Sequence, residues 1–127
     1  MTKKEDILNF VEWKKSKGAQ DPIFVVYMVQ NANKEMILKD GRPSGFPDFG
    51  HCENVGFYYD IDSAIHALET NSCDIRECMY DAGFVLCRFP GLYESAVPKE
   101  RMFFVWNEEQ GGFIQAEESP FMLHVAL

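Results

Sequence analysis

The residues best suited to bind a metal ion or attack a substrate are Cys52, Cys73, Cys78, Cys87, His51, His66 and His124. Structural zinc sites favour closely spaced pairs of these residue types. Cys73 and Cys78 are five positions apart, which on a helix turns their side chains roughly 140° away from each other. His51 and Cys52 are adjacent, and neighbours in an extended chain point to opposite sides. We therefore predict reduced thiols, no metal site and no cofactor.

Cysteine catalysis requires a thiolate beside a base. A histidine would have to approach a cysteine through the fold, because no cysteine lies in a recognisable nucleophile motif. The sequence therefore gives no reason to expect a catalytic cysteine.

Acidic residues crowd the segment from 60 to 81, and paired carboxylates can perform acid–base catalysis or hold a divalent cation. Their spacing differs from that of an EF-hand loop, which needs acids at alternate positions, a central glycine and a terminal glutamate. Helix capping explains most of them. We predict no catalytic residue among these carboxylates, which are Asp60, Asp62, Asp74, Glu77 and Asp81.

Aromatic residues are abundant, with eleven Phe, five Tyr and two Trp in 127 residues. In the segment 102–106, which contains Phe103 and Trp106, both faces of a predicted strand are apolar. One face would cover a helix, and the other would meet a further layer of the same chain, a second copy or a partner protein. Phe46 and Phe49, in a Gly- and Pro-rich loop over 41–50, either fold back onto the core or form a contact patch.

These residues are positioned by elements whose periodicity is visible in the sequence. Thr2 with Glu5 forms a capping-box pattern, and Ile7, Leu8 and Val11 recur at helical spacing, which predicts an N-terminal helix over about 3–17. The main helix shows the same periodicity. Asp60 or Asp62 would cap it, and it would end near Asn71, with an apolar stripe of Ile61, Ala64, Ile65 and Leu68.

The remaining segments have strand or turn signals. The run from Ile23 to Val29 predicts a central strand covered on both faces, and a short strand over 35–39 precedes the 41–50 loop. A strand over 55–59 would place Val55, Phe57 and Tyr59 on one face. Asp74 with Glu77 suggests a second capping box on a short helix or turn, followed by a strand over 84–89 and a hairpin of 101–106 with 113–117.

The predicted fold is a single α+β domain over 1–127, with an antiparallel sheet packed against one main helix plus an N-terminal helix. The sheet-and-helix core would span about 22–118, and an apolar tail would occupy 119–127. No apolar signal segment follows Met1, so we expect a cytoplasmic protein. The longest apolar run has seven residues, too short to span a membrane.

The net charge of −8 and the pI near 4.8 bear on partners. An acidic surface repels the phosphate backbone, so we expect no direct nucleic-acid binding. Stacking of single strands on sheet aromatics would need basic flanks, whereas the hairpin carries Glu108, Glu109, Glu117 and Glu118. Two interpretations of the acidic surface remain. It is either a solvated surface that keeps the protein soluble or an acidic face that binds a basic partner.

Residues from about 56 to 118 resemble a family of small uncharacterised proteins of bacteria and their phages, a domain of unknown function. The resemblance implies a shared sheet-and-helix core and no assigned activity. It is carried by Gly56-Phe57-Tyr58, Asp60-x-Asp62-x-Ala64-Ile65, Asn71, Asp74-Ile75, Glu77, Tyr80, the strand ending at Phe89, and Pro90-Gly91-Leu92-Tyr93.

Three functions remain open. The first is a small acidic cytoplasmic protein-interaction module without catalytic activity, such as a phage-related inhibitor of a basic nucleic-acid-handling protein. The second is a small enzyme or ligand-binding domain with a pocket near the 41–50 loop. The third is a structural homodimer through the strand at 102–106, which a monomeric mass in solution would exclude. The partner- or ligand-binding candidates are Phe46, Phe49, His51, Tyr58, Asp60, Arg88, Phe103 and Trp106.

Overall fold

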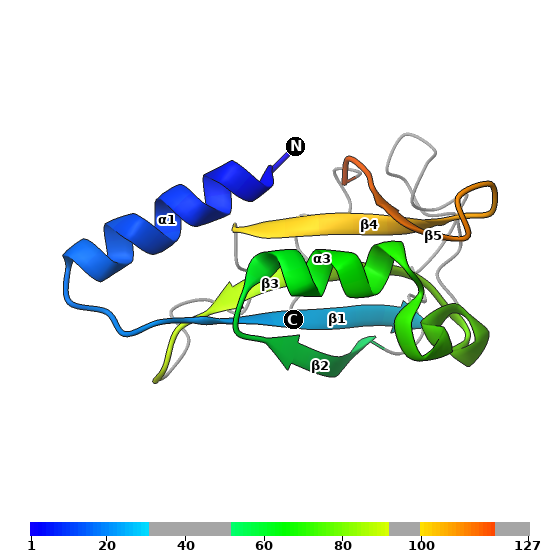
Figure 1. The fold of residues 1–127 in the computed structure, drawn as a ribbon, viewed down its shortest axis with the longest axis horizontal. Helices are drawn as coiled ribbons and strands as arrows, with labels where there is room; N and C mark the ends of the chain where they lie inside the picture. The colour runs from blue at the N-terminus through cyan, green and yellow to red at the C-terminus, as the bar shows by residue number, and fades with distance from the viewer. Residues whose placement is uncertain (31–51, 92–99, 119–127) are drawn as a thin grey trace, which may run out of the picture.

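A computed structural model describes residues 1–30, 52–91 and 100–118. These residues form a five-stranded antiparallel sheet with helices packed on one face, which confirms the predicted α+β class (Figure 1). The predicted strand at 35–39, the 41–50 loop and the tail at 119–127 lie outside the described residues. In chain order the elements are α1 (Lys4–Ser16), β1 (Ile23–Gln30), β2 (Cys52–Tyr58), α3 (Ile61–Glu69), the 3-10 helix η1 (Ser72–Cys78), β3 (Tyr80–Arg88), β4 (Arg101–Asn107) and β5 (Gly112–Gln115).

The sheet order is β2-β1-β3-β4-β5, so β1 and β3 are interior strands and β2 lies at one edge. β1 is buried on both faces, as predicted. Phe24 and Val26 join the cluster on the helix side, whereas Val25 and Val29 join a second cluster on the opposite side. The strand alternation therefore divides the core into two layers.

α3 follows the sequence prediction closely. Asp60 caps the helix, and Ile61, Ala64 and Leu68 are buried against the sheet. The helix ends at Glu69, two residues before the expected end. There its backbone lies directly against Gly112 at the start of β5, where a Cβ atom would overlap the Glu69 carbonyl oxygen.

α1 differs from prediction at its start and in the width of its apolar stripe. The helix begins at Lys4, and the backbone N–H of Lys3 donates to the Asp6 carboxylate at 2.8 Å, so the predicted Thr2 capping box is wrong by one residue. Ile7 is buried, but Leu8 is 39% exposed. Because successive helical residues turn about 100°, Leu8 lies off the buried side that Ile7 defines.

β2 contains a bulge that the sequence pattern did not reveal. Val26 pairs with Gly56 and Tyr27 pairs with Asn54, which leaves Val55 as the extra residue. The predicted alternation of Val55, Phe57 and Tyr59 on one face is therefore wrong: Val55 lies in the bulge, and Tyr59 follows the end of the strand.

Asn71 organises η1, in place of the predicted Asp74–Glu77 capping box. The Asn71 side chain accepts from the Arg76 backbone N–H at 2.9 Å and donates to the Glu77 carboxylate at 3.0 Å. Asp74 has a φ of 53°, a left-handed conformation that is incompatible with the extended backbone of an N-cap.

The predicted hairpin of β4 and β5 is confirmed, and an ion pair lies beside it on the sheet face opposite α3. The Arg101 guanidinium, in a residue only 3% exposed, contacts the Glu118 carboxylate at 2.6 Å and lies 4.8 Å from the Phe84 ring centroid. The Arg101 charge is therefore neutralised by Glu118 in the interior and adds no positive charge to the accessible surface.

We predict that Gly112→Ala lowers the free energy of unfolding by about 1–3 kcal/mol, because the added methyl overlaps the Glu69 carbonyl. Gly56→Ala is the matched control, since a Cβ there meets nothing within 4 Å. We expect it to change stability by less than about 0.5 kcal/mol. Urea denaturation monitored by circular dichroism measures both, and equal midpoints for the two variants would contradict the close packing of α3 on β5.

Candidate functional site

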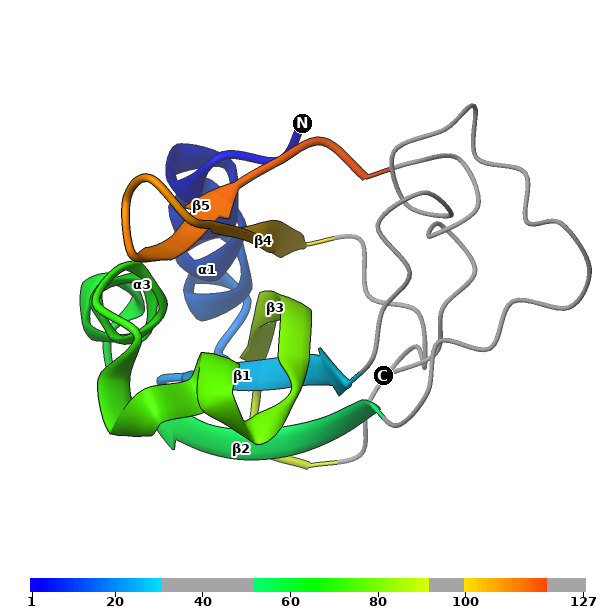
Figure 2. The same ribbon diagram turned by 90° about the vertical axis from the view of Figure 1, so that its right-hand side faces the viewer.

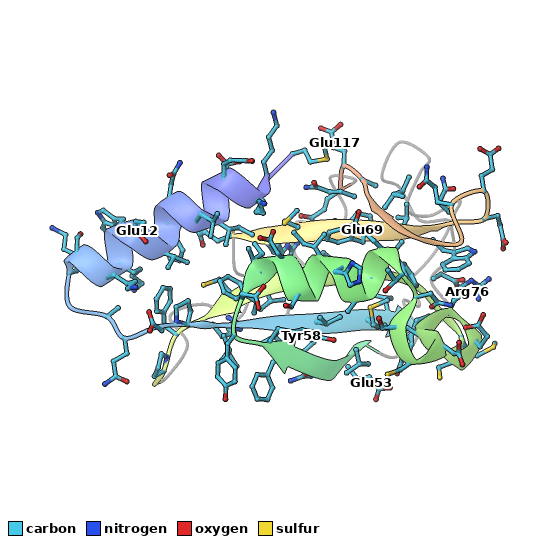
Figure 3. The ribbon with its side chains drawn as sticks, viewed as in Figure 1. Glu12, Glu53, Tyr58, Glu69, Arg76 and Glu117 are labelled. Carbon is cyan, nitrogen blue, oxygen red and sulfur yellow. The ribbon has the colours of Figure 1, made fainter. Side chains whose placement is uncertain are left out.

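Two adjoining cavities lie between β2, α3 and η1. Their volumes are about 600 and 560 Å³, and both are lined by Tyr58, Ala67 and Ser72. We call the combined hollow the β2–α3 groove. Glu53 and Tyr58 extend from β2, and Glu69 extends from α3 (Figure 3). The remaining lining residues are Val26, Asn54, Val55, Gly56, Phe57, Asp62, Ser63, Ile65, His66, Cys73, Ile75, Cys78 and Tyr80.

The groove exists because α3 is fixed at both ends. At its start, Asp60 follows β2 closely in the chain and caps the first turn. At its end, the Glu69 backbone lies against Gly112 of β5. Viewed nearly along its axis, α3 has β5 on one side and β2 on the other (Figure 2). Small side chains at Ser63 and Ala67 line the groove, so they leave space beside β2.

One wall of the groove is apolar and solvent-accessible. Val55 is 41% exposed and Tyr58 is 36% exposed, and both line the larger cavity. Phe57 is 51% exposed and borders the same cavity, but it pairs with Val25, so its side chain lies on the opposite face of the sheet. Tyr59, immediately after β2, packs its ring on Phe57 with the centroids 5.8 Å apart. Clustered exposed aromatic side chains of this kind mark contact surfaces more often than isolated ones do.

The inner part of the groove contains polar groups that hold its shape. The Tyr80 hydroxyl donates to the Glu53 carboxylate, linking the start of β3 to β2 across the interior strand β1. Tyr80 is itself buried. This hydrogen bond fixes a carboxylate at the base of an otherwise mainly apolar cavity.

The charge of the groove is negative. Glu53, Asp62 and Glu69 line it, and among the described residues no Lys or Arg lines either cavity. Lys4 reaches Asp62 from α1 at 2.9 Å. Arg76 is directed elsewhere: it contacts Asp81 at 3.4 Å and lies over the Trp106 ring, 5.8 Å from the centroid.

The structure separates the residues of the predicted pocket near the 41–50 loop. Tyr58 pairs with Phe24, whose side chain lies in the helix-side cluster, whereas Arg88 pairs with Ile23 in the opposite cluster. Tyr58 and Arg88 therefore occupy opposite faces of the sheet, because side chains alternate along a strand. Phe46, Phe49 and His51 lie outside the described residues.

Asp60 lies beside the groove, but its carboxylate is engaged in capping. It accepts from the Ser63 hydroxyl at 2.7 Å and from the Ser63 backbone N–H at 2.8 Å. Both bonds favour the ionised form and lower the pKa of Asp60. The structural role explains why this residue type follows β2.

The Phe103 and Trp106 side chains pack against other aromatic rings of the same chain. Phe103 is 2% exposed and packs on Phe84 with a centroid distance of 5.1 Å, and Trp106 packs on Phe113 at 5.2 Å. β4 is hydrogen-bonded to β3 on one side and β5 on the other. β4 therefore has no open edge for pairing with a second copy, and the predicted homodimer through the strand at 102–106 stays a prediction.

Sequence reasoning missed Glu53, His66, Glu69 and Tyr80 as groove residues. Glu53 was missed because the strand was expected to begin at residue 55, whereas it begins at Cys52. The helix residues did carry a signal, since the small side chains Ser63 and Ala67 are four positions apart and share one side of α3.

The described part of the chain contains no cluster of three or more His, Cys, Asp or Glu side chains arranged to hold a metal ion. None of its helices combines the length and apolar character that crossing a membrane requires. Comparison with known protein families, characterised proteins and solved structures gave no significant match. The site must therefore be interpreted from its own geometry.

We predict that Asp60→Ala destabilises the protein in a pH-dependent manner. The lowered pKa means that ionised Asp60 stabilises the fold above its ordinary value of 3.8, and this contribution is lost as the pH falls through the lowered value. The urea midpoints of wild type and variant should differ at pH 7 and converge near pH 2. Glu109→Ala, in the exposed β4–β5 turn, is the control, and a difference for Asp60→Ala that is independent of pH would contradict this role.

We also predict that maleimide labelling distinguishes the cysteines of the groove from the cysteine of the core. Cys73 and Cys78 are exposed, whereas burial raises the pKa of the Cys87 thiol to about 12. At pH 8 only about one Cys87 in ten thousand is then a thiolate. Peptide mapping should show Cys73 and Cys78 modified first and Cys87 modified only after unfolding in urea. Equal labelling rates for these three cysteines in the folded protein would contradict the exposed positions of Cys73 and Cys78 and the buried position of Cys87.

Proposed function

We propose that this protein is a small acidic interaction module that binds a basic segment of another protein in the β2–α3 groove, without catalysing a reaction. The observation that carries the proposal is the composition of the groove. The exposed Tyr58 ring lies beside three carboxylates, and none of the described Lys or Arg residues lines either cavity.

The two kinds of side chain serve different parts of binding. Aromatic residues in partly enclosed sites supply most of the contact energy in protein interfaces, because they bury large areas with few rotatable bonds. Carboxylates around them select cationic partners and accelerate association, mainly at low ionic strength. A segment in which Lys or Arg alternates with apolar residues satisfies both requirements.

The net charge of −8 supports a partner with an extended basic surface. Proteins that handle nucleic acids carry such surfaces, because they neutralise phosphates with Lys and Arg. We therefore propose that the partner is a nucleic-acid-handling protein and that binding blocks its nucleic-acid site. The protein would then act in the cytoplasm as a phage-related inhibitor.

Self-association through the groove is electrostatically unfavourable. Two copies meeting there would bring Glu53, Asp62 and Glu69 of each chain together. Like charges placed opposite each other oppose binding. A basic partner therefore fits the groove better than a second copy does.

The proposal predicts a charge signature in selected ligands. A random decapeptide library displayed on phage and selected on the full chain at low salt should yield peptides enriched in Lys and Arg. For the tightest of these, Glu69→Lys should weaken the Kd about tenfold, which is about 1.4 kcal/mol. Glu109→Lys is the matched control, because it makes the same charge change in the β4–β5 turn and lines neither cavity.

Isothermal titration calorimetry measures both dissociation constants. The control should weaken binding less than about twofold, as expected for a remote charge screened by salt. Selected peptides without basic enrichment would contradict the proposal. Equal losses for Glu69→Lys and Glu109→Lys would also contradict it, because net charge alone would then determine binding.

A further inference from the structure

We infer that the bound segment pairs with the outer edge of β2 as an added β-strand, a sixth strand beside the five that the structure describes. The inference rests on the proposed function and specifies how the groove holds its ligand. Edge strands present unpaired backbone N–H and C=O groups that can bind an extended peptide, and pockets for alternate side chains provide specificity.

β2 is suited to this role by its position and its composition. It is a terminal strand of the described sheet and has seven residues, whereas β5 at the other edge has four. Natural edge strands are commonly protected by Lys or Pro residues. β2 contains neither residue type and instead exposes Val55, Phe57 and Tyr58. The protective features in its own sequence are the bulge at Val55, the charged Glu53, and the Asn54 side chain, which accepts from the Gly56 backbone N–H at 2.8 Å.

The opposite edge is arranged differently. The Gln115 side chain of β5 donates to the Thr2 backbone carbonyl at 2.5 Å, so the N-terminal segment already lies beside this strand. The Ala116 backbone N–H donates to the Phe103 backbone carbonyl at 2.9 Å, which continues the pairing with β4 past the end of β5. β5 therefore offers a shorter edge with a neighbour already in place.

The groove lies where an added strand would need side-chain pockets. Glu53 pairs with Met28 and Tyr58 pairs with Phe24, so both belong to the helix side of the sheet. An added strand would direct every second side chain toward that same side. Those side chains would meet Glu53, Tyr58 and Glu69, whereas the intervening ones would lie on the opposite face of the sheet, with the Phe57 side chain.

Charge complementarity identifies the occupant as a basic segment of a second protein. Its alternate Lys or Arg side chains would reach the carboxylates, and its backbone would complete the β2 ladder. An acidic or neutral strand would gain the backbone hydrogen bonds but would lack the ionic contacts.

Backbone methylation of the peptide tests the pairing directly. The probe is the tightest basic decapeptide from the library selection, synthesised with each backbone amide N-methylated in turn. In a strand only every second N–H points toward its neighbour. We expect affinity losses of about tenfold or more at alternate positions within the paired stretch and small changes between them. Amide hydrogen exchange should slow along β2 and remain unchanged along β5, which is the internal control.

A side-chain pair of variants completes the test. Phe57→Ala should weaken binding about tenfold, whereas Ile114→Ala, an exposed apolar residue of β5, should have less than a twofold effect. A bound basic peptide without the period-two pattern, or with protection along β5, would overturn strand addition and leave the proposed function standing. Failure to select any basic peptide would overturn both.

Discussion

The groove depends on how α3 is held at its two ends. At the first end the Asp60 carboxylate caps the helix directly after β2, and at the second end the Glu69 backbone packs on Gly112 of β5, where there is no room for a side chain. Between these points the helix buries Ile61, Ala64 and Leu68 and cannot also fill the space beside β2. The hollow beside the edge strand is therefore a consequence of the helix position rather than of a missing side chain.

The acidic character of the surface follows from twenty Asp and Glu residues against twelve Lys and Arg residues, several of which are paired within the chain. Four of the described basic side chains contact carboxylates within the chain: Lys4 with Asp62, Lys15 with Asp21, Arg76 with Asp81 and Arg101 with Glu118. The Arg101 pair is buried, so it contributes no long-range positive potential comparable to an exposed residue. Each ion pair neutralises one charge of each sign, so the eight-charge excess of carboxylates in the composition remains.

Much of the fold could be predicted from local patterns, but the groove could not. The buried run of β1, the cap and apolar stripe of α3, and the β4–β5 hairpin each follow from periodicity or turn residues within one segment. The groove combines β2, α3 and η1, and its geometry depends on a bulge at Val55 and on left-handed residues such as Asn71, neither of which leaves a periodic signal. The proposed grouping of Tyr58 with Arg88 failed for a related reason. It ignored the alternation of strand faces, which becomes decisive only once the register is known.

The most direct test of the account is a heteronuclear NMR titration of the isotopically labelled full chain with a basic peptide from the library selection. Binding in the β2–α3 groove predicts saturable shifts concentrated in residues 52–58, 61–69 and 72–78, with the Glu108–Glu109 turn unchanged. Weak, unsaturable shifts spread over all exposed acidic residues would contradict it, because they would show that the net charge attracts cations without a specific site.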